Sequence, residues 1–143
     1  MFQFRHIAIV CKGDIAQLKE FYTALFNPSK IIISEEFGTQ VEGITGITNI
    51  NIVTCKIFSD KFNIELIKYN NPKVNLILNN SPAFSGFNHI ALTVDDFSLA
   101  INKLLKHGGK LLGNGIPNKT SKIVNAIYAT DPEGNILEIV QEV

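Results

Sequence analysis

The stretch Phe87-Asn88-His89-Ile90-Ala91-Leu92-Thr93-Val94 decides the fold, because the chain contains a second copy of its pattern. It is an apolar, strand-like run with one histidine set inside it. Near the N-terminus, Phe4-Arg5-His6-Ile7-Ala8-Ile9-Val10 has the same pattern with the histidine in the same place. A second correspondence links Asn63-Ile64-Glu65-Leu66-Ile67 with Asn135-Ile136-Leu137-Glu138-Ile139. The chain therefore reads as two copies of one module, each with a histidine and a glutamate in apolar strands.

The first module, about residues 1–70, is predicted as strand, helix, strand, strand, strand. Its first strand, Phe4–Cys11, is apolar on both faces, which is typical of a strand that is covered on both sides. Asp14 is a good N-cap for a helix that runs to about Phe26, with apolar residues at spacings of three and four. The other strands are expected at Ile31–Ser34, Asn49–Phe58 and Asn63–Tyr69.

The second module, about residues 86–143, repeats this order after a linker over about residues 71–85. Asp95 or Asp96 caps its helix, and Gly108-Gly109 ends that helix. Its strands are expected at Phe87–Val94, Lys110–Leu112, Lys122–Thr130 and Asn135–Gln141. The first module is longer between its histidine and its glutamate, and we expect the extra residues in a loop over Ser34–Asn49 that overhangs the site. The fold class is α+β, with two repeated βαβββ modules that form a curved mixed sheet around a metal site within one domain, residues 1–143.

The composition excludes several classes of protein. Hydrophobic residues make up 45% of the 143 residues and charged residues 18%, against roughly 25% charged residues in an average globular chain. The 13 basic and 13 acidic residues balance, which disfavours nucleic acid and membrane surfaces as partners. No apolar run approaches the roughly 20 residues of a spanning helix, and the early first strand leaves no room for a cleavable signal. Cys11 and Cys55 lack metal-type spacing, so we expect buried free thiols in a soluble cytoplasmic protein.

The candidate metal ligands are His6, Glu65, His89 and Glu138. A single core histidine or edge-strand glutamate has a structural explanation, but matching positions in two modules favour a shared metal. A buried carboxylate needs a cation nearby, and two imidazoles with two carboxylates neutralise one divalent ion. This set suits zinc, nickel, cobalt or manganese, and six-coordination leaves two positions for substrate oxygens on neighbouring carbons. The remaining polar candidates are better explained by a helix-end contact for His107 and by solvated loops for Asn118, Lys119 and Lys122.

The two modules resemble the vicinal oxygen chelate superfamily, and the resemblance covers essentially the whole chain. That superfamily includes glyoxalase I, methylmalonyl-CoA epimerase, extradiol dioxygenases, and fosfomycin and bleomycin resistance proteins. The motifs that carry the resemblance are His6-Ile7-Ala8-Ile9, Glu20-Phe21-Tyr22 with Leu25-Phe26, His89–Asp96, and the closing Asp131-Pro132-Glu133-Gly134-Asn135-Ile136-Leu137-Glu138. The nearest members by these motifs are glyoxalase I and methylmalonyl-CoA epimerase.

The four candidate ligands favour some members of the superfamily over others, and two other positions differ from the patterns of glyoxalase I and the epimerases. Two histidines with two glutamates are similar to glyoxalase I, whereas the dioxygenases and fosfomycin-modifying transferases use one glutamate and the bleomycin-binding members lack the metal. Val10 stands where glyoxalase I has an arginine for glutathione. The strand Ile50–Lys56 lacks the additional carboxylate that the epimerases carry there.

The resemblance implies a divalent-metal-dependent isomerase, lyase or epimerase of the glyoxalase type. Its small substrate would have vicinal oxygens and react through a metal-stabilised enediolate, and the chain would form a homodimer, with each site within one chain or across two. Glu138 is the expected base, because its strand begins just after Gly134 whereas its partner Glu65 lies mid-strand. The alternatives are a small-molecule binding or resistance protein of the bleomycin type and an extradiol-type dioxygenase.

Overall fold

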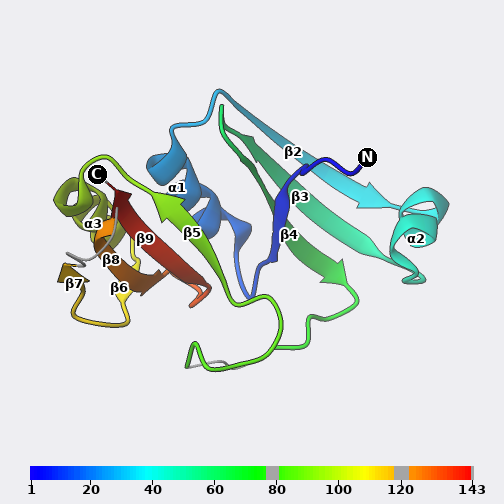
Figure 1. Cartoon of the computed structure of the whole chain (residues 1–143). Coiled ribbons are helices and arrows are strands. Elements are labelled where there is room, and N and C mark those ends of the chain that lie inside the picture. Colours follow the sequence, from blue (N-terminus) through cyan, green and yellow to red (C-terminus); the bar gives the residue numbers. More distant parts are fainter. Residues whose placement is uncertain (77–80, 118–122, 143) are drawn as a thin grey trace. The chain divides into compact units, whose positions relative to one another are not determined.

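The computed structural model of the chain describes residues 1–76, 81–117 and 123–142 (Figure 1). It consists of two compact units, Met1–Leu76 and Ile77–Val143, so that the division falls within the range expected as the linker. Each unit contains a mixed sheet with a helix packed on it. The fold is α+β with two βαβββ modules, as the sequence predicts.

The first unit contains a four-stranded sheet in the order β1-β4-β3-β2. β1 and β4 are parallel, whereas β4, β3 and β2 pair antiparallel. The helix α1 packs on β3 and β4, and buries Leu18, Phe21 and Tyr22. Its N-cap is Asp14, as predicted, whose carboxylate accepts a hydrogen bond from the Ala16 amide at 3.0 Å. The elements are β1 (Ile7–Val10), α1 (Ile15–Phe26), β2 (Lys30–Phe37), α2 (Thr39–Thr45), β3 (Asn51–Phe58) and β4 (Asn63–Asn71).

The second unit repeats this topology in the order β5-β9-β8-β6, again with its first and last strands parallel. The short strands β6 and β7 both pair antiparallel with β8. The helix α3 packs on β9, and Asp96 is its N-cap, accepting from the Leu99 amide at 2.8 Å. The elements are β5 (His89–Thr93), α3 (Phe97–Lys106), β6 (Lys110–Leu111), β7 (Ile116–Pro117), β8 (Ile123–Thr130) and β9 (Ile136–Glu142).

The segment expected as a loop over Ser34–Asn49 is mostly regular structure, so that prediction was wrong. β2 continues to Phe37, which pairs with Asn51 of β3. The helix α2 then runs from Thr39 to Thr45 and ends at Gly46, whose φ of 73° is left-handed. With only 7 residues, α2 is too short for an apolar period to be visible in the sequence.

The first strand also differs from its prediction. β1 starts at Ile7, so His6 immediately precedes the strand instead of lying within it. Only one face of β1 is covered, because Ile9 is buried whereas Ala8 and Val10 are exposed. The apolar sequence of this segment therefore reflects one buried face and one open face that carries small or aliphatic side chains.

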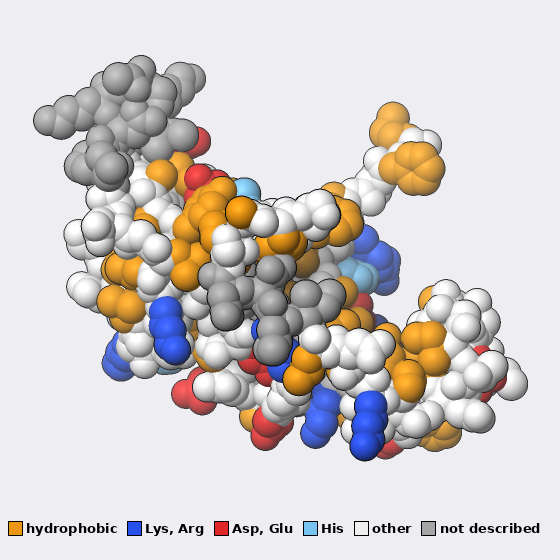
Figure 2. Space-filling model, turned by 90° about the horizontal axis from the view of Figure 1, so that it is seen from below, with side chains coloured by type: hydrophobic (Ala, Val, Ile, Leu, Met, Phe, Trp, Pro, Cys, Tyr) orange, Lys and Arg blue, Asp and Glu red, His pale blue; other side chains and the backbone are white. Residues whose placement is uncertain are grey.

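The apolar residues that the composition indicates are found both in the core and on the surface. Cys11 and Cys55 are buried thiols, as predicted, and burial raises the pKa of the Cys55 thiol. Hydrophobic side chains also reach the surface in many places (Figure 2). In the described residues, no helix is long and apolar enough to cross a membrane.

Candidate functional site

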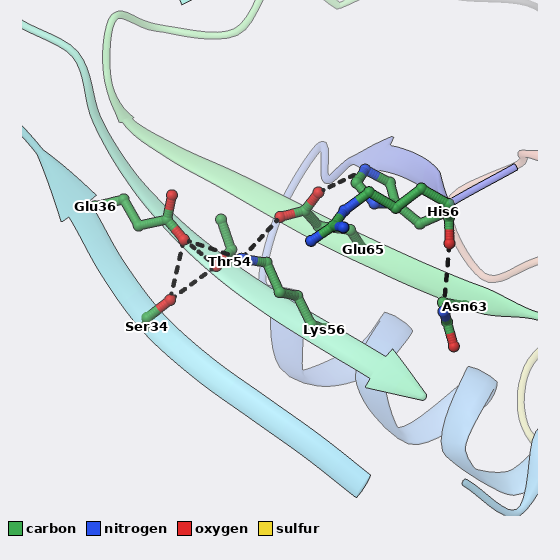
Figure 3. A network of polar contacts seen from close by, with 8 residues as sticks. His6, Ser34, Glu36, Thr54, Lys56, Asn63 and Glu65 are labelled. Carbon is green, nitrogen blue, oxygen red and sulfur yellow. Dashed lines mark hydrogen bonds and ion pairs between the residues drawn. The ribbon is translucent and has the colours of Figure 1, made fainter. Parts of the chain in front are cut away.

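In the first unit, His6 lies beside Glu65. The parallel pairing of β1 with β4 places Ala8 directly opposite Glu65, and His6 precedes Ala8 by two positions. The Nε2 atom of the His6 imidazole lies 2.9 Å from Glu65 Oε2 (Figure 3). The Glu65 side chain is only 13% exposed. The register of two strands thus brings two of the candidate ligands together.

The second unit repeats this arrangement. β5 pairs with β9 so that Ala91 lies opposite Glu138, and His89 again precedes the alanine by two positions. His89 Nε2 lies 3.3 Å from Glu138 Oε2, and Glu138 is 30% exposed. The Tyr128 ring packs beside the imidazole, with 4.9 Å between ring centroids. Each unit therefore places its predicted histidine beside its predicted glutamate.

The turn before β9 fixes the start of the strand that carries Glu138. Asp131 is buried, and its Oδ1 atom accepts hydrogen bonds from the amides of Glu133 at 2.9 Å and Asn135 at 3.0 Å. Its Oδ2 atom accepts a third from the Asn135 side chain at 2.7 Å. These contacts explain why the closing Asp-Pro-Glu-Gly-Asn motif forms a tight β8–β9 connection.

Both histidine–glutamate pairs fit a divalent metal. The nitrogen–oxygen separations of 2.9 Å and 3.3 Å are short enough for one ion with ligand bonds of about 2.0–2.1 Å to contact both atoms of a pair. In the tautomer that donates from His89 Nδ1 to Asn88 Oδ1, 3.0 Å away, His89 Nε2 presents a lone pair toward the carboxylate. Within neither unit do the described residues gather three or more metal-ligating side chains. Each unit alone therefore brings together two of the four candidate ligands.

A lysine adjoins the first pair on the same face of the sheet. Lys56 of β3 lies directly opposite Glu65 of β4, because these strands pair antiparallel. Its Nζ atom lies 3.8 Å from Glu65 Oε1 and 3.5 Å from Glu36 Oε1. Figure 3 shows Lys56 reaching between the two carboxylates, with His6 beside Glu65. One ammonium group thus contacts a candidate metal ligand and a second carboxylate.

Glu36 is firmly held in this network. Its Oε1 atom accepts hydrogen bonds from Thr54 Oγ1 at 2.9 Å and from Ser34 Oγ at 3.1 Å. Burial opposes its charged form, but the two hydroxyl donors and the charge of Lys56 together lower the pKa of Glu36 below its ordinary value. Glu36 is therefore an ionised anchor in this group.

The sequence reasoning missed this network. It found no carboxylate on β3, which is correct, but the nearby carboxylate comes from β2, where the predicted strand ended at Ser34. The alternation of Ile32, Ser34 and Glu36 along a longer β2 is the signal that indicates a shared face. Asn118, Lys119 and Lys122 lie outside the described residues.

Comparisons with known proteins place the fold. The model of the Glyoxalase/Bleomycin resistance protein/Dioxygenase superfamily matches residues 5–126. A glyoxalase family protein from Bacillus cereus is 18% identical with a TM-score of 0.82, covering 100% of this chain and 95% of that one. The fosfomycin resistance protein FosX from Mesorhizobium loti is 15% identical with a TM-score of 0.59, covering 98% and 91% of the two chains. No curated protein sequence matches the chain significantly.

Proposed function

We propose a metal-dependent reaction for this chain, which belongs to the Glyoxalase/Bleomycin resistance protein/Dioxygenase superfamily. The reaction is an isomerisation, lyase reaction or epimerisation of the glyoxalase type on a small substrate with oxygens on neighbouring carbons. The observation that carries the proposal is the identical placement of His6 with Glu65 and of His89 with Glu138. The repeated fold explains the shared register, and a common ligand role explains why the same two residue types recur at these positions.

The proposed ligands of one divalent metal are the two pairs together, either within one chain or across two copies. The two carboxylates balance the charge of a divalent ion, the two imidazoles are neutral, and the set suits zinc, nickel, cobalt or manganese. When bound, the metal supplies Lewis acidity that polarises a substrate carbonyl and makes the neighbouring C–H bond more acidic. Ile136 and Val140 lie two positions before and after Glu138, on the same face of β9, and both are buried.

Glu138 is the proposed base that removes the proton from carbon. Its carboxylate is 30% exposed, and its only ion pair among the described residues is with His89 at 3.3 Å. Glu65 is 13% exposed and contacts both His6 and Lys56. A base must move toward the proton that it takes, and Glu138 has fewer contacts that oppose such a movement.

Hydrogen–deuterium exchange at carbon tests this proposal. Metal-loaded protein is incubated in D2O with a panel of small α-hydroxy and α-oxo compounds, and deuterium next to the carbonyl is followed by NMR. We expect metal-dependent deuterium incorporation in at least one compound, and its loss in Glu138→Gln. The matched control is Glu142→Gln, an exposed carboxylate on the same strand, which should exchange at the wild-type rate.

The same assay separates the two alternatives. A ligand that is retained by the protein and recovered without deuterium would indicate a binding or resistance protein. Oxygen consumption that requires ferrous iron would indicate a dioxygenase. Either outcome without carbon exchange would overturn the proposed reaction.

A homodimer is part of the proposal. β2 is at the edge of the first sheet, and Ile31 and Ile33 on it are exposed. Exposed apolar side chains on an edge strand favour pairing with another surface. Light scattering coupled to size exclusion should give twice the 15.8 kDa mass of one chain, and a monomeric mass would contradict this.

A further inference from the structure

The two glutamates differ in the residue that faces each of them on the neighbouring antiparallel strand. In the first unit Lys56 of β3 lies opposite Glu65 of β4. In the second unit the equivalent position opposite Glu138 is Tyr128 of β8. The repeat is thus broken at this position, because among the described residues only Glu65 of the two candidate ligands has an ammonium group beside it.

Lys56 is held at this position from its other side. Glu36 lies 3.5 Å from the ammonium, and hydroxyl groups of Ser34 and Thr54 hold Glu36 in turn. Thr54 is 1% exposed, so one of the two hydroxyl groups that hold Glu36 is packed within the sheet. The Nζ atom therefore lies near Glu65 Oε1, while Glu65 Oε2 faces His6.

We propose that Lys56 is a positioning residue, which holds one oxygen of Glu65 and thereby leaves Glu138 as the movable glutamate. The inference rests on the proposed function and adds a reason why two like ligands take different roles. A carboxylate whose two oxygens are each engaged has less freedom to leave a metal and approach a substrate proton. The ammonium also repels a cation bound nearby, so Lys56 tunes the affinity of the site for the metal.

Metal affinity tests this inference without reference to activity. We expect Lys56→Met to bind Co²⁺ about tenfold more tightly by calorimetric titration, because a repelling charge near a partly exposed site is removed. Lys56→Arg keeps the positive charge and should bind Co²⁺ with the wild-type affinity. The matched control Lys68→Met removes a charge on the opposite face of β4 and should change the affinity less than about twofold.

Replacing Glu36, the carboxylate that holds Lys56, should change the Co²⁺ affinity in the opposite direction. Glu36→Gln removes a negative charge and should weaken Co²⁺ binding about threefold, whereas Glu35→Gln, on the other face of β2, should leave it unchanged. General damage to the sheet would weaken binding in both Lys56→Met and Glu36→Gln. Unchanged or weaker binding in Lys56→Met would overturn the inference.

Two further measurements complete the test. In carbon exchange, the loss caused by Glu138→Gln should be at least about tenfold smaller in the Lys56→Met background, because Glu65 is then free to act as the base. In metal-free protein, a double-mutant cycle over Lys56 and Glu65 should show a coupling of about two- to fivefold in the unfolding equilibrium.

The outcomes distinguish a failure of the proposed function from a failure of the proposed role of Lys56. A wild-type protein that binds no Co²⁺ contradicts the proposed function, whereas zero coupling in the metal-free cycle contradicts the role of Lys56 by itself. If the wild type binds Co²⁺ and the two variants Lys56→Met and Lys68→Met bind it with equal affinity, the proposed role of Lys56 is wrong but the proposed function stands.

Discussion

Replacing each of the two glutamates by glutamine should have unequal effects on turnover. Glu138→Gln keeps an oxygen ligand of the same size but removes its basicity, so turnover should fall by the roughly 10²–10⁴-fold typical of losing a general base. That range corresponds to about 3–5 kcal/mol of transition-state stabilisation. Metal affinity should fall only modestly, because the side-chain oxygen remains.

Glu65→Gln should reduce turnover less, by about tenfold or below. Glu65 is the glutamate proposed to be held in place, with His6 at 2.9 Å and Lys56 at 3.8 Å. Lys56 is 39% exposed, so the lost ion pair is screened by solvent and contributes only about 0.2–1 kcal/mol.

The assay is turnover or carbon exchange at matched metal occupancy for both variants, with Glu142→Gln as the control. Equal losses would mean that the two carboxylates share the proton transfer. A larger loss for Glu65→Gln would reverse the assignment and refute the reasoning from exposure and ion pairing.

Three further outcomes are expected. Activity on the methylglyoxal–glutathione adduct should be weak or absent, because Val10 supplies no cation for glutathione; efficient turnover would move the protein to glyoxalase I proper. Glu36 stabilises the fold above its ordinary pKa of 4.5, and this contribution is lost as pH falls through its lower folded value, so Glu36→Gln should flatten the acid limb of a Tm-versus-pH curve. Gly109→Ala should destabilise the protein by about 1–3 kcal/mol in urea, because its Cβ would clash with the buried Leu104 side chain and lie 2.8 Å from the Thr130 carbonyl oxygen; wild-type stability would contradict this packing.

The sequence predicted the features that depend on local patterns. The repeat was visible because both halves have the same apolar runs around a histidine and a glutamate. Together with the helix caps and the apolar spacing, it indicated two βαβββ modules. Asp14 and Asp96 cap their helices as expected, since capping requires only a short side chain at the right position. These signals are contained within a few residues of sequence.

The features that the sequence did not reveal depend on strand register. Lys56 faces Glu65 only because β3 and β4 pair at that offset, and no local pattern specifies the offset. Glu36 was missed because the predicted strand ended at Ser34, where two glutamates in succession resemble a loop. The length of β2 is set by its pairing with β3, which is a tertiary property.

Metal content of the purified protein tests the proposed function most directly. We expect about one divalent ion per chain by elemental analysis in the wild type and in His107→Ala, which removes the remaining histidine of the 3 in the sequence. His6→Ala/His89→Ala should lose nearly all of the ion, because each unit then keeps a single carboxylate. Full metal content in that double variant would contradict the proposed site.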